Sequence, residues 1–223
     1  MCIFLALPTS TGYILWSNRD EQVTRATADE VSRDVERKCQ YVKDLVSGGT
    51  WLAVHDSWVY AVLLNAPSGN PGGVFATRGM MALQVMERCA LWDDLPILAT
   101  KIQQELPRKT YRSCIFAIGG IHAGKLQHHV FMRQTQTQHL DHQTPTWSLF
   151  LSSPNLYTAD GHNKRDQESK RIAPTTEALK AFMSSHTYDV GNSLCIIEED
   201  VGTRSTSIIT VGEQVSYTYE IRA

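Results

Sequence analysis

Hydrophobic and polar positions follow two different periods along the chain, and these periods predict its elements. Short apolar runs at residues 2–7 and 13–17, separated by a polar turn, are typical of a β-hairpin. Two further runs at 51–55 and 59–65 meet at a tight turn and predict a second hairpin. Residues 24–47 between the hairpins are polar and charged, so we expect short helical or irregular structure there.

The period then changes to that of a helix. In residues 80–92 apolar residues recur at helical spacing, and a second helix is predicted over 95–106. A charged helix is expected over 163–184. The remaining apolar runs predict strands at 114–120, 126–132, 147–152, 205–211 and 214–221.

The order of these elements indicates the fold class. Strands occur in groups with helices between the groups, and they do not alternate with helices one by one. This segregation predicts an α+β fold with antiparallel sheets and outer helices, in which two sheets packed face to face between helical layers fit the order. A chain of 223 residues is long enough for one substantial core, so we expect a single domain over residues 1–223.

Charge and hydropathy exclude two classes of partner. The chain has 21 Lys and Arg against 23 Asp and Glu, a net charge of −2, so no basic surface for nucleic acid is expected. No apolar run reaches the roughly 18 residues that a membrane-spanning helix needs. The first residues lack the basic region of a signal peptide, and we therefore expect a cytoplasmic protein.

Cysteine and histidine spacing predicts no metal site. The five cysteines are scattered without a CxxC pair, which argues against a disulfide framework and a zinc ribbon. In a strand, His128 and His129 point to opposite faces, while His139 and His142 lie in a Gln/Thr-rich segment that we expect to be a loop. We interpret these four histidines as structural or solvent-exposed.

Cys2 is the cysteine with distinctive chemistry. If Met1 is removed, Cys2 carries both a thiol and a free α-amine, and the amine titrates near pH 8. Such an amine takes the proton of the thiol, so one residue supplies a nucleophile and its base. Asp20 is placed to orient the amine, and Arg19 to hold a thiolate or a substrate carbonyl. The alternative is a core cysteine followed by a solvated polar turn.

Several segments resemble the NRDE family, whose best-known eukaryotic members are the Transport and Golgi organization type-two proteins. The family is named for the tetrapeptide that stands here at 18–21, after a start at Met-Cys. Four further segments resemble family motifs in the same order: GGTWLAV (48–54), AVLLNAP (61–67), ATRG (76–79) and GTRSTSIITV (202–211). Two segments depart from the family pattern, RAT (25–27) and SSPNLYTADG (152–161).

The NRDE family is similar in pattern to N-terminal nucleophile (Ntn) hydrolases of the choloylglycine hydrolase and penicillin V acylase type. This resemblance implies a four-layer αββα sandwich with antiparallel sheets. It also implies a set of catalytic residues, with Cys2 as nucleophile, an early Arg/Asp pair, two asparagines at the oxyanion hole and a late arginine. In this sequence these are Cys2, Arg19, Asp20, Asn65, Asn155 and Arg204. The alternatives are turn-forming asparagines and a surface ion pair of Arg204.

Two functions follow from the resemblance. The first is intracellular haem handling or trafficking, the role that the family implies, on an Ntn-hydrolase-like fold. The alternative is a cysteine amidohydrolase that cleaves a non-peptide C–N bond through a Cys2 thioester. Hydrolysis requires no cofactor, whereas haem would be a bound ligand. In both cases the expected partner is a small molecule: haem, a lipid or acyl compound, or an amide substrate.

Overall fold

The computed structural model describes most of the chain, and contacts divide the chain into two compact units. Unit 1 combines Met1–Arg25 with Trp147–Ala223, and unit 2 is Ala26–Thr146. The prediction of a single domain over residues 1–223 stays a prediction. The described residues are 2–22, 24–66, 74–89, 94–105, 111–134, 140–145, 148–152, 165–184 and 201–221.

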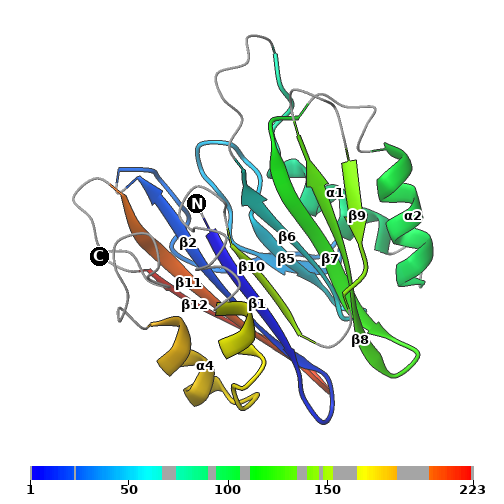
Figure 1. The fold of residues 1–223 in the computed structure, drawn as a ribbon. Helices are drawn as coiled ribbons and strands as arrows, with labels where there is room; N and C mark the ends of the chain where they lie inside the picture. The colour runs from blue at the N-terminus through cyan, green and yellow to red at the C-terminus, as the bar shows by residue number, and fades with distance from the viewer. Residues whose placement is uncertain are drawn as a thin grey trace. The chain divides into compact units, whose positions relative to one another are not determined.

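Unit 1 is built on a five-stranded antiparallel sheet in the order β10-β1-β2-β11-β12. Figure 1 shows the blue strands from the start of the chain beside the orange and red strands from its end. The sheet therefore joins the Met-Cys and NRDE segments to the GTRSTS segment. Its strands are β1 (Cys2–Pro8), β2 (Tyr13–Gln22), β10 (Leu149–Ser152), β11 (Val201–Val211) and β12 (Val215–Ile221).

One face of this sheet packs on helix α4 (Thr176–Met183). Ile3, Leu5 and Leu7 alternate along β1 and form a buried cluster with Leu179 and Met183 of the helix. Because side chains alternate across a strand, the residues between them lie on the opposite face of the sheet. Cys2 is one of these residues, so its side chain is on the face away from α4.

Unit 2 contains a seven-stranded antiparallel sheet whose neighbours follow chain order, β3 to β9. Helices α1 (Met80–Cys89) and α2 (Leu95–Glu105) pack on one face, where their apolar residues form a buried cluster with Phe116 and Phe131. The strands are β3 (Ser32–Asp34), β4 (Cys39–Tyr41), β5 (Leu52–His55), β6 (Val59–Asn65), β7 (Cys114–His122), β8 (Lys125–Arg133) and β9 (Leu140–Gln143). The expected antiparallel sheets with accompanying helices are thus confirmed.

Three predicted segments differ from the structure. Residues 24–47 contain strands β3 and β4, which are three residues each and too short to show a period of two. His142 lies in strand β9 and not in a loop. The helix expected over 163–184 is interrupted: residues 165–169 are helical, and α4 begins only after Pro174, whose ring cannot continue a helix.

Two of the family-like segments meet through glycine. The amide nitrogen of Thr50, in the GGTW segment, donates to the carbonyl oxygen of Gly79, in the TRG segment, at 3.1 Å. A Cβ added to Gly49 would stand 2.4 Å from the carbonyl carbon of Gly79. This backbone approach requires glycine, so these two segments have a packing role in unit 2.

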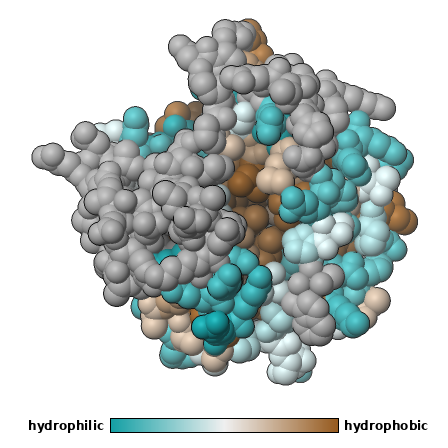
Figure 2. Space-filling view, in the orientation of Figure 1, coloured by the Kyte–Doolittle hydropathy of each residue, from teal (hydrophilic) through white to brown (hydrophobic). Residues whose placement is uncertain are grey.

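The visible face of the described residues carries both polar and apolar side chains. Figure 2 shows hydrophilic side chains over much of the visible described surface, with smaller apolar areas between them. Val74, at 94% exposure, and Val35, at 78%, are the most exposed large apolar side chains in the described part of the chain. Among the helices of the described residues, none combines the length and apolar character needed to cross a membrane.

Candidate functional site

Cys2 lies in β1 directly opposite Arg19 of β2. The side chain of Cys2 is buried, at 5% exposure. Burial raises the pKa of its thiol; the positive N-terminus and Arg19 act against this, and the charge of Asp20 adds to it. A thiol with a raised pKa is protonated at neutral pH, so Cys2 needs a base before it can act as a nucleophile.

Arg19 places a positive charge on the same face of the sheet as Cys2, because directly opposed residues of an antiparallel pair share a face. Its side chain is 4% exposed, and Nη2 lies 3.7 Å from Oε2 of Glu21. Glu21 in turn lies 3.6 Å from Nε of Arg25. The structure therefore brings Arg19 and Cys2 together, as the resemblance implied, within a short chain of charged side chains.

Asp20 is the next residue of β2 and is fully buried. It lies opposite Thr203 of β11, whose hydroxyl donates to Oδ1 of Asp20 at 2.6 Å. Burial raises the pKa of Asp20 to about 7, while the Thr203 hydrogen bond and the positive N-terminus act in the lowering direction. A carboxyl group that titrates near neutral pH is a frequent feature of catalytic sites.

Arg204 is the extra residue of a β-bulge in β11. The register shifts between the pairs Thr203–Asp20 and Ser205–Arg19, which leaves Arg204 unopposed between them. Bulges redirect a side chain and are common beside active sites. The bulge therefore places Arg204 next to both members of the predicted Arg/Asp pair, and its side chain is partly buried.

Asn18, the first residue of the tetrapeptide, has a structural role on the opposite face. Its Nδ2 donates to the carbonyl oxygen of Met183 in α4 at 3.0 Å, and its Oδ1 accepts from Nε1 of Trp16 at 2.9 Å. The hydroxyl of Thr206 donates to the same Oδ1 at 3.0 Å. Asn18 thus ties two strands to the helix that covers them.

Of the two asparagines predicted for the oxyanion hole, the structure describes only Asn65. Asn65 is the last residue of β6 in unit 2 and lies opposite Cys114. Its strand end is held at Ser113, whose carbonyl oxygen accepts from the amide of Ala66 at 3.2 Å and from Nη1 of Arg78 at 2.6 Å. Asn155 lies outside the described residues. The catalytic roles of both asparagines stay predictions.

Sequence reasoning missed two kinds of residue around Cys2. Thr203 precedes Arg204 in the GTRSTS segment, so the sequence could have indicated that it lies near the site. Its pairing with Asp20 could not be predicted, because it depends on the register between β2 and β11. Ser17 and Ser205 lie on the face of Cys2 and gave no signal, since serine in a strand is ordinary. Their buried hydroxyls become informative only in the structure.

The described histidines form structural contacts. Nδ1 of His128 lies 2.5 Å from the hydroxyl of Tyr60, and the ring of Tyr60 packs against Gly119. Nδ1 of His129 lies 3.1 Å from Nε2 of His142 on the neighbouring strand. No group of three potential ligands suited to a metal occurs among the described residues. His139 lies outside them.

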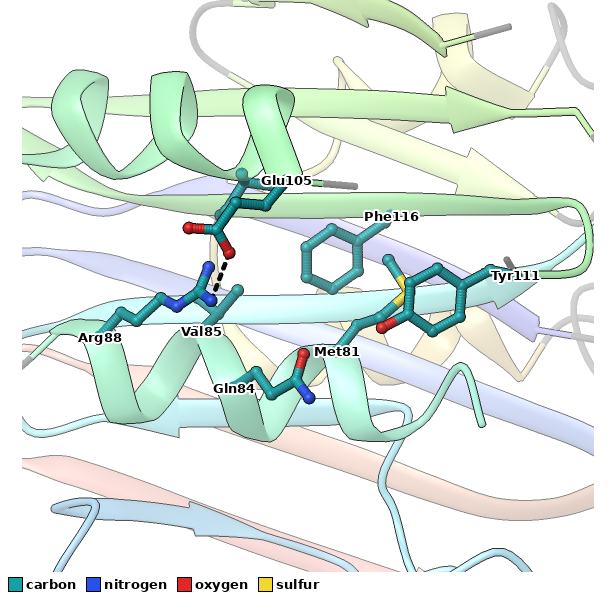
Figure 3. Close-up of a pocket in the computed structure, with 8 residues that line it drawn as sticks. Met81, Gln84, Val85, Arg88, Glu105, Tyr111 and Phe116 are labelled. Atoms are coloured by element: carbon teal, nitrogen blue, oxygen red, sulfur yellow. Dashed lines mark ion pairs between the residues drawn. The ribbon is translucent and has the colours of Figure 1, made fainter. Parts of the chain in front are cut away.

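A crevice in unit 2 lies between α1, α2 and β7. It encloses about 330 Å³ of empty space, including its open mouth. Figure 3 shows Arg88 of α1 and Glu105 of α2 joined by an ion pair at one end, with Phe116 and Tyr111 toward the other. Among the described residues that line the crevice, none is a cysteine, serine or histidine. The lining residues are Met81, Gln84, Val85, Arg88, Ile102, Glu105, Tyr111 and Phe116.

The chemistry available around Cys2 is that of acyl transfer. A buried thiol, a buried guanidinium and a carboxyl group with a pKa of about 7 lie at adjacent positions of one sheet. Together they can hold a thiolate, orient an amine and stabilise a developing negative charge.

Comparison with protein families gives a match over residues 1–106. The matching family is described as Transport and Golgi organisation 2. The match includes Cys2, the NRDE tetrapeptide and the GGTW, LLNAP and TRG segments, whereas GTRSTS lies beyond it. The resemblance predicted from the sequence is confirmed over these residues. A comparison with curated proteins gave no match.

Comparison with solved structures confirms the fold type. The chain is similar to a structure described as the Caenorhabditis elegans N-acylethanolamine-hydrolyzing acid amidase (NAAA) ortholog, with a TM-score of 0.53. The likeness covers 94% of this chain and 92% of that one, at 10% sequence identity. At this identity the likeness shows the fold alone. The predicted α+β fold of Ntn-hydrolase type, with antiparallel sheets, is therefore confirmed.

Proposed function

We propose that the protein is a cysteine amidohydrolase that uses Cys2 as its N-terminal nucleophile. One observation carries the proposal: Cys2 lies directly opposite the buried Arg19, with a buried carboxyl group at the next position of β2. The similarity in fold to an N-acylethanolamine-hydrolyzing acid amidase supports the same class of reaction. The substrate class is a non-peptide amide, and the reaction needs no cofactor.

The reaction begins when removal of Met1 makes the backbone nitrogen of Cys2 a free α-amine. This amine takes the proton of the thiol, directly or through one water, and the thiolate attacks the carbonyl carbon of the amide. A C–S bond forms and the C–N bond breaks, while the leaving amine takes the proton from the α-ammonium. Water, activated by the same α-amine, then breaks the C–S bond, releases the carboxylic acid and restores the thiol.

The other residues are assigned by charge and hydrogen bonding. Asp20 orients the α-amine, because its carboxyl lies at the end of β2 beside the start of β1. Arg19 and Arg204 stabilise the negative charge that develops during attack. For Asn65 and Asn155 the family resemblance alone implies a role as side-chain N–H donors to the oxyanion, and such a donor contributes about 3–4 kcal/mol of transition-state stabilisation.

The test is amide hydrolysis by protein whose N-terminal residue has been verified as Cys2. A panel of N-acyl amides is offered to wild type, Cys2→Ala and Cys2→Ser. We expect Cys2→Ala to lower kcat by at least about 10³-fold, because removal of a nucleophile abolishes the covalent route. Cys89→Ala, which removes a buried thiol from α1, is the matched control and should hydrolyse as wild type does. Equal rates for wild type and Cys2→Ala would reject the proposal.

Haem handling in the cytoplasm is the second candidate, supported by the family match over residues 1–106. The Cys2 thiol is the group that would ligate the iron, as thiolates do in haem proteins. The test is a haem titration of wild type and Cys2→Ala beside a nonspecific control protein. A Soret shift that wild type shows and Cys2→Ala loses would support the candidate. A shift no larger than that of the control protein would reject it.

A further inference from the structure

Three serines surround Arg19 on the face of the unit 1 sheet that carries Cys2. Arg19 lies between Cys2 of β1 and Ser205 of β11, because it is the register partner of both. Ser17 is two residues before Arg19 in β2 and lies opposite Ser207 of β11. Since opposed residues share a face and alternate residues return to it, all five side chains lie on one side of the sheet.

Two of these hydroxyls are buried without a hydrogen bond. Ser17 is 1% exposed and Ser205 is 2% exposed, and among the residues the structure describes neither Oγ has a partner. Ser207, on the same face, accepts from the hydroxyl of Tyr217 at 3.2 Å. Most buried polar side chains in folded proteins are hydrogen-bonded, so two unpaired hydroxyls side by side need an explanation.

The distances within an antiparallel sheet bring these hydroxyls into reach of a group bound to Cys2. Directly opposed Cβ atoms are about 5 Å apart, and diagonal neighbours about 7–8 Å. Ser17 is the diagonal neighbour of Cys2, and Ser205 lies one strand beyond Arg19. An acyl chain joined to the sulfur of Cys2 that extends across Arg19 therefore passes Ser17 at the diagonal position and reaches Ser205 on the next strand, about 10 Å from Cys2.

We infer that Ser17 and Ser205 bind an oxygen substituent on the acyl group of the substrate. The inference rests on the proposed amidohydrolase function and names its substrate class: amides of short hydroxy or oxo acids. A hydroxyl or carbonyl oxygen close to the scissile bond satisfies both serine hydroxyls, because each can donate or accept.

The kinetic test uses matched pairs of anilides, butanoyl against 3-hydroxybutanoyl and 3-oxobutanoyl. Wild type should prefer the oxygenated partner at least about tenfold in kcat/KM, because a site built to bind a hydroxyl discriminates against an analogue that lacks it. The double variant Ser17→Ala/Ser205→Ala should lose this preference, so that its kcat/KM values for the paired anilides become equal. Ser152→Ala, a buried serine on the opposite face of the same sheet, is the matched control and should keep the preference.

A binding test separates this inference from the proposed hydrolysis. Cys2→Ala protein, with and without the two serine substitutions, is titrated with 3-hydroxybutanoate and with butanoate, and its Tm is followed. A rise in Tm with the hydroxy acid alone, absent when both serines are alanine, supports the inference even if no amide is hydrolysed. If the hydroxy acid binds but no amide is hydrolysed, the proposed function is rejected and the binding of the oxygen substituent by the serines is retained.

Two outcomes overturn the inference. One is hydrolysis of the paired anilides at equal rates by wild type, which leaves the proposed function intact. The other is an equal response of Tm to both acids, which indicates that the serine hydroxyls bind water only. The serine substitutions themselves should not lower Tm, because they remove hydroxyls that make no hydrogen bond within the described part of the chain.

Discussion

The hydroxyl of Thr203 donates a 2.6 Å hydrogen bond to Oδ1 of Asp20, joining positions 183 residues apart in the chain. The bond is buried between β2 and β11 and adjoins the bulge at Arg204. Asp20 therefore keeps one oxygen anchored while burial raises its pKa to about 7. This contact holds the carboxyl group at the position of β2 that follows Arg19, the residue opposite Cys2.

The buried Asp20 should make stability fall as pH rises. Its pKa is raised from 3.8 to about 7 in the folded protein, so the folded state holds the proton more tightly than the unfolded chain. The stabilisation is fully present below pH 3.8 and is lost as pH rises through about 7. At about 1.4 kcal/mol per pKa unit, the loss is about 4 kcal/mol.

Asp20→Asn should remove this pH dependence while keeping the hydrogen bond from Thr203. Urea denaturation of wild type and variant between pH 4 and 8 measures it, and the variant should gain stability relative to wild type toward pH 8. Thr203→Val is the second variant. The Thr203 hydrogen bond lowers the pKa of Asp20, so loss of the hydroxyl should raise this pKa further. Parallel stability curves for wild type and Asp20→Asn would contradict the raised pKa.

Asn18→Ala should destabilise the protein without acting on the chemistry. The substitution leaves Nε1 of Trp16, the hydroxyl of Thr206 and the carbonyl oxygen of Met183 without their buried partner. Since each lost buried hydrogen bond costs about 1 kcal/mol, we expect a loss of about 3 kcal/mol. Thr206→Val removes one of these bonds and should cost less. Denaturant titration checks the order, and equal stability of Asn18→Ala and wild type would refute the structural role.

Two adjacent glycines should respond differently to alanine. Gly49→Ala places a Cβ 2.4 Å from the Gly79 carbonyl carbon, so the backbone must shift, at about 3 kcal/mol. Gly48 has φ +74° but no atom within 4 Å of an added Cβ, so its substitution should cost about 1 kcal/mol. Thermal unfolding of both variants makes the comparison. If Gly48→Ala is the less stable of the two, the close approach of the two segments is wrong.

His129 should titrate well below the usual histidine range. Burial is the main cause that lowers the pKa of His129, to about 4, and the charges of His142 and His122 act in the same direction. His142→Gln removes one of these charges and should raise the pKa of His129 without restoring 6.5, because burial remains. Side-chain NMR titration of the imidazole measures both values. A wild-type pKa near 6.5 would contradict the burial of His129 in the sheet.

The parts of the fold that the sequence predicts are those with a regular apolar period. The run from Cys2 to Leu7 is apolar and buried throughout, and the helix that begins at Met80 buries helically spaced residues, so hydropathy reveals both. The end of β2 is different, because buried Asn18 and Asp20 are polar. Their burial is balanced by partners on other elements, and no local pattern shows that.

The candidate site divides in the same way. Cys2, Arg19 and Asp20 belong to one hairpin, and a resemblance to motifs in that hairpin was enough to group them. Thr203 enters through a strand at the far end of the chain, and the bulge at Arg204 is visible only as a register shift. The unpaired hydroxyls of Ser17 and Ser205 are properties of packing, which no sequence pattern records.

The central claim is that Cys2 is an N-terminal nucleophile, and intact-protein mass spectrometry tests it most directly. The purified protein is incubated with a reactive acyl amide, quenched in acid, and mapped by peptide sequencing. We expect a chain that has lost Met1 and carries one acyl group on Cys2, with no adduct on Cys2→Ala. A chain that retains Met1, or that remains unacylated at Cys2 while the amide is consumed, would contradict it.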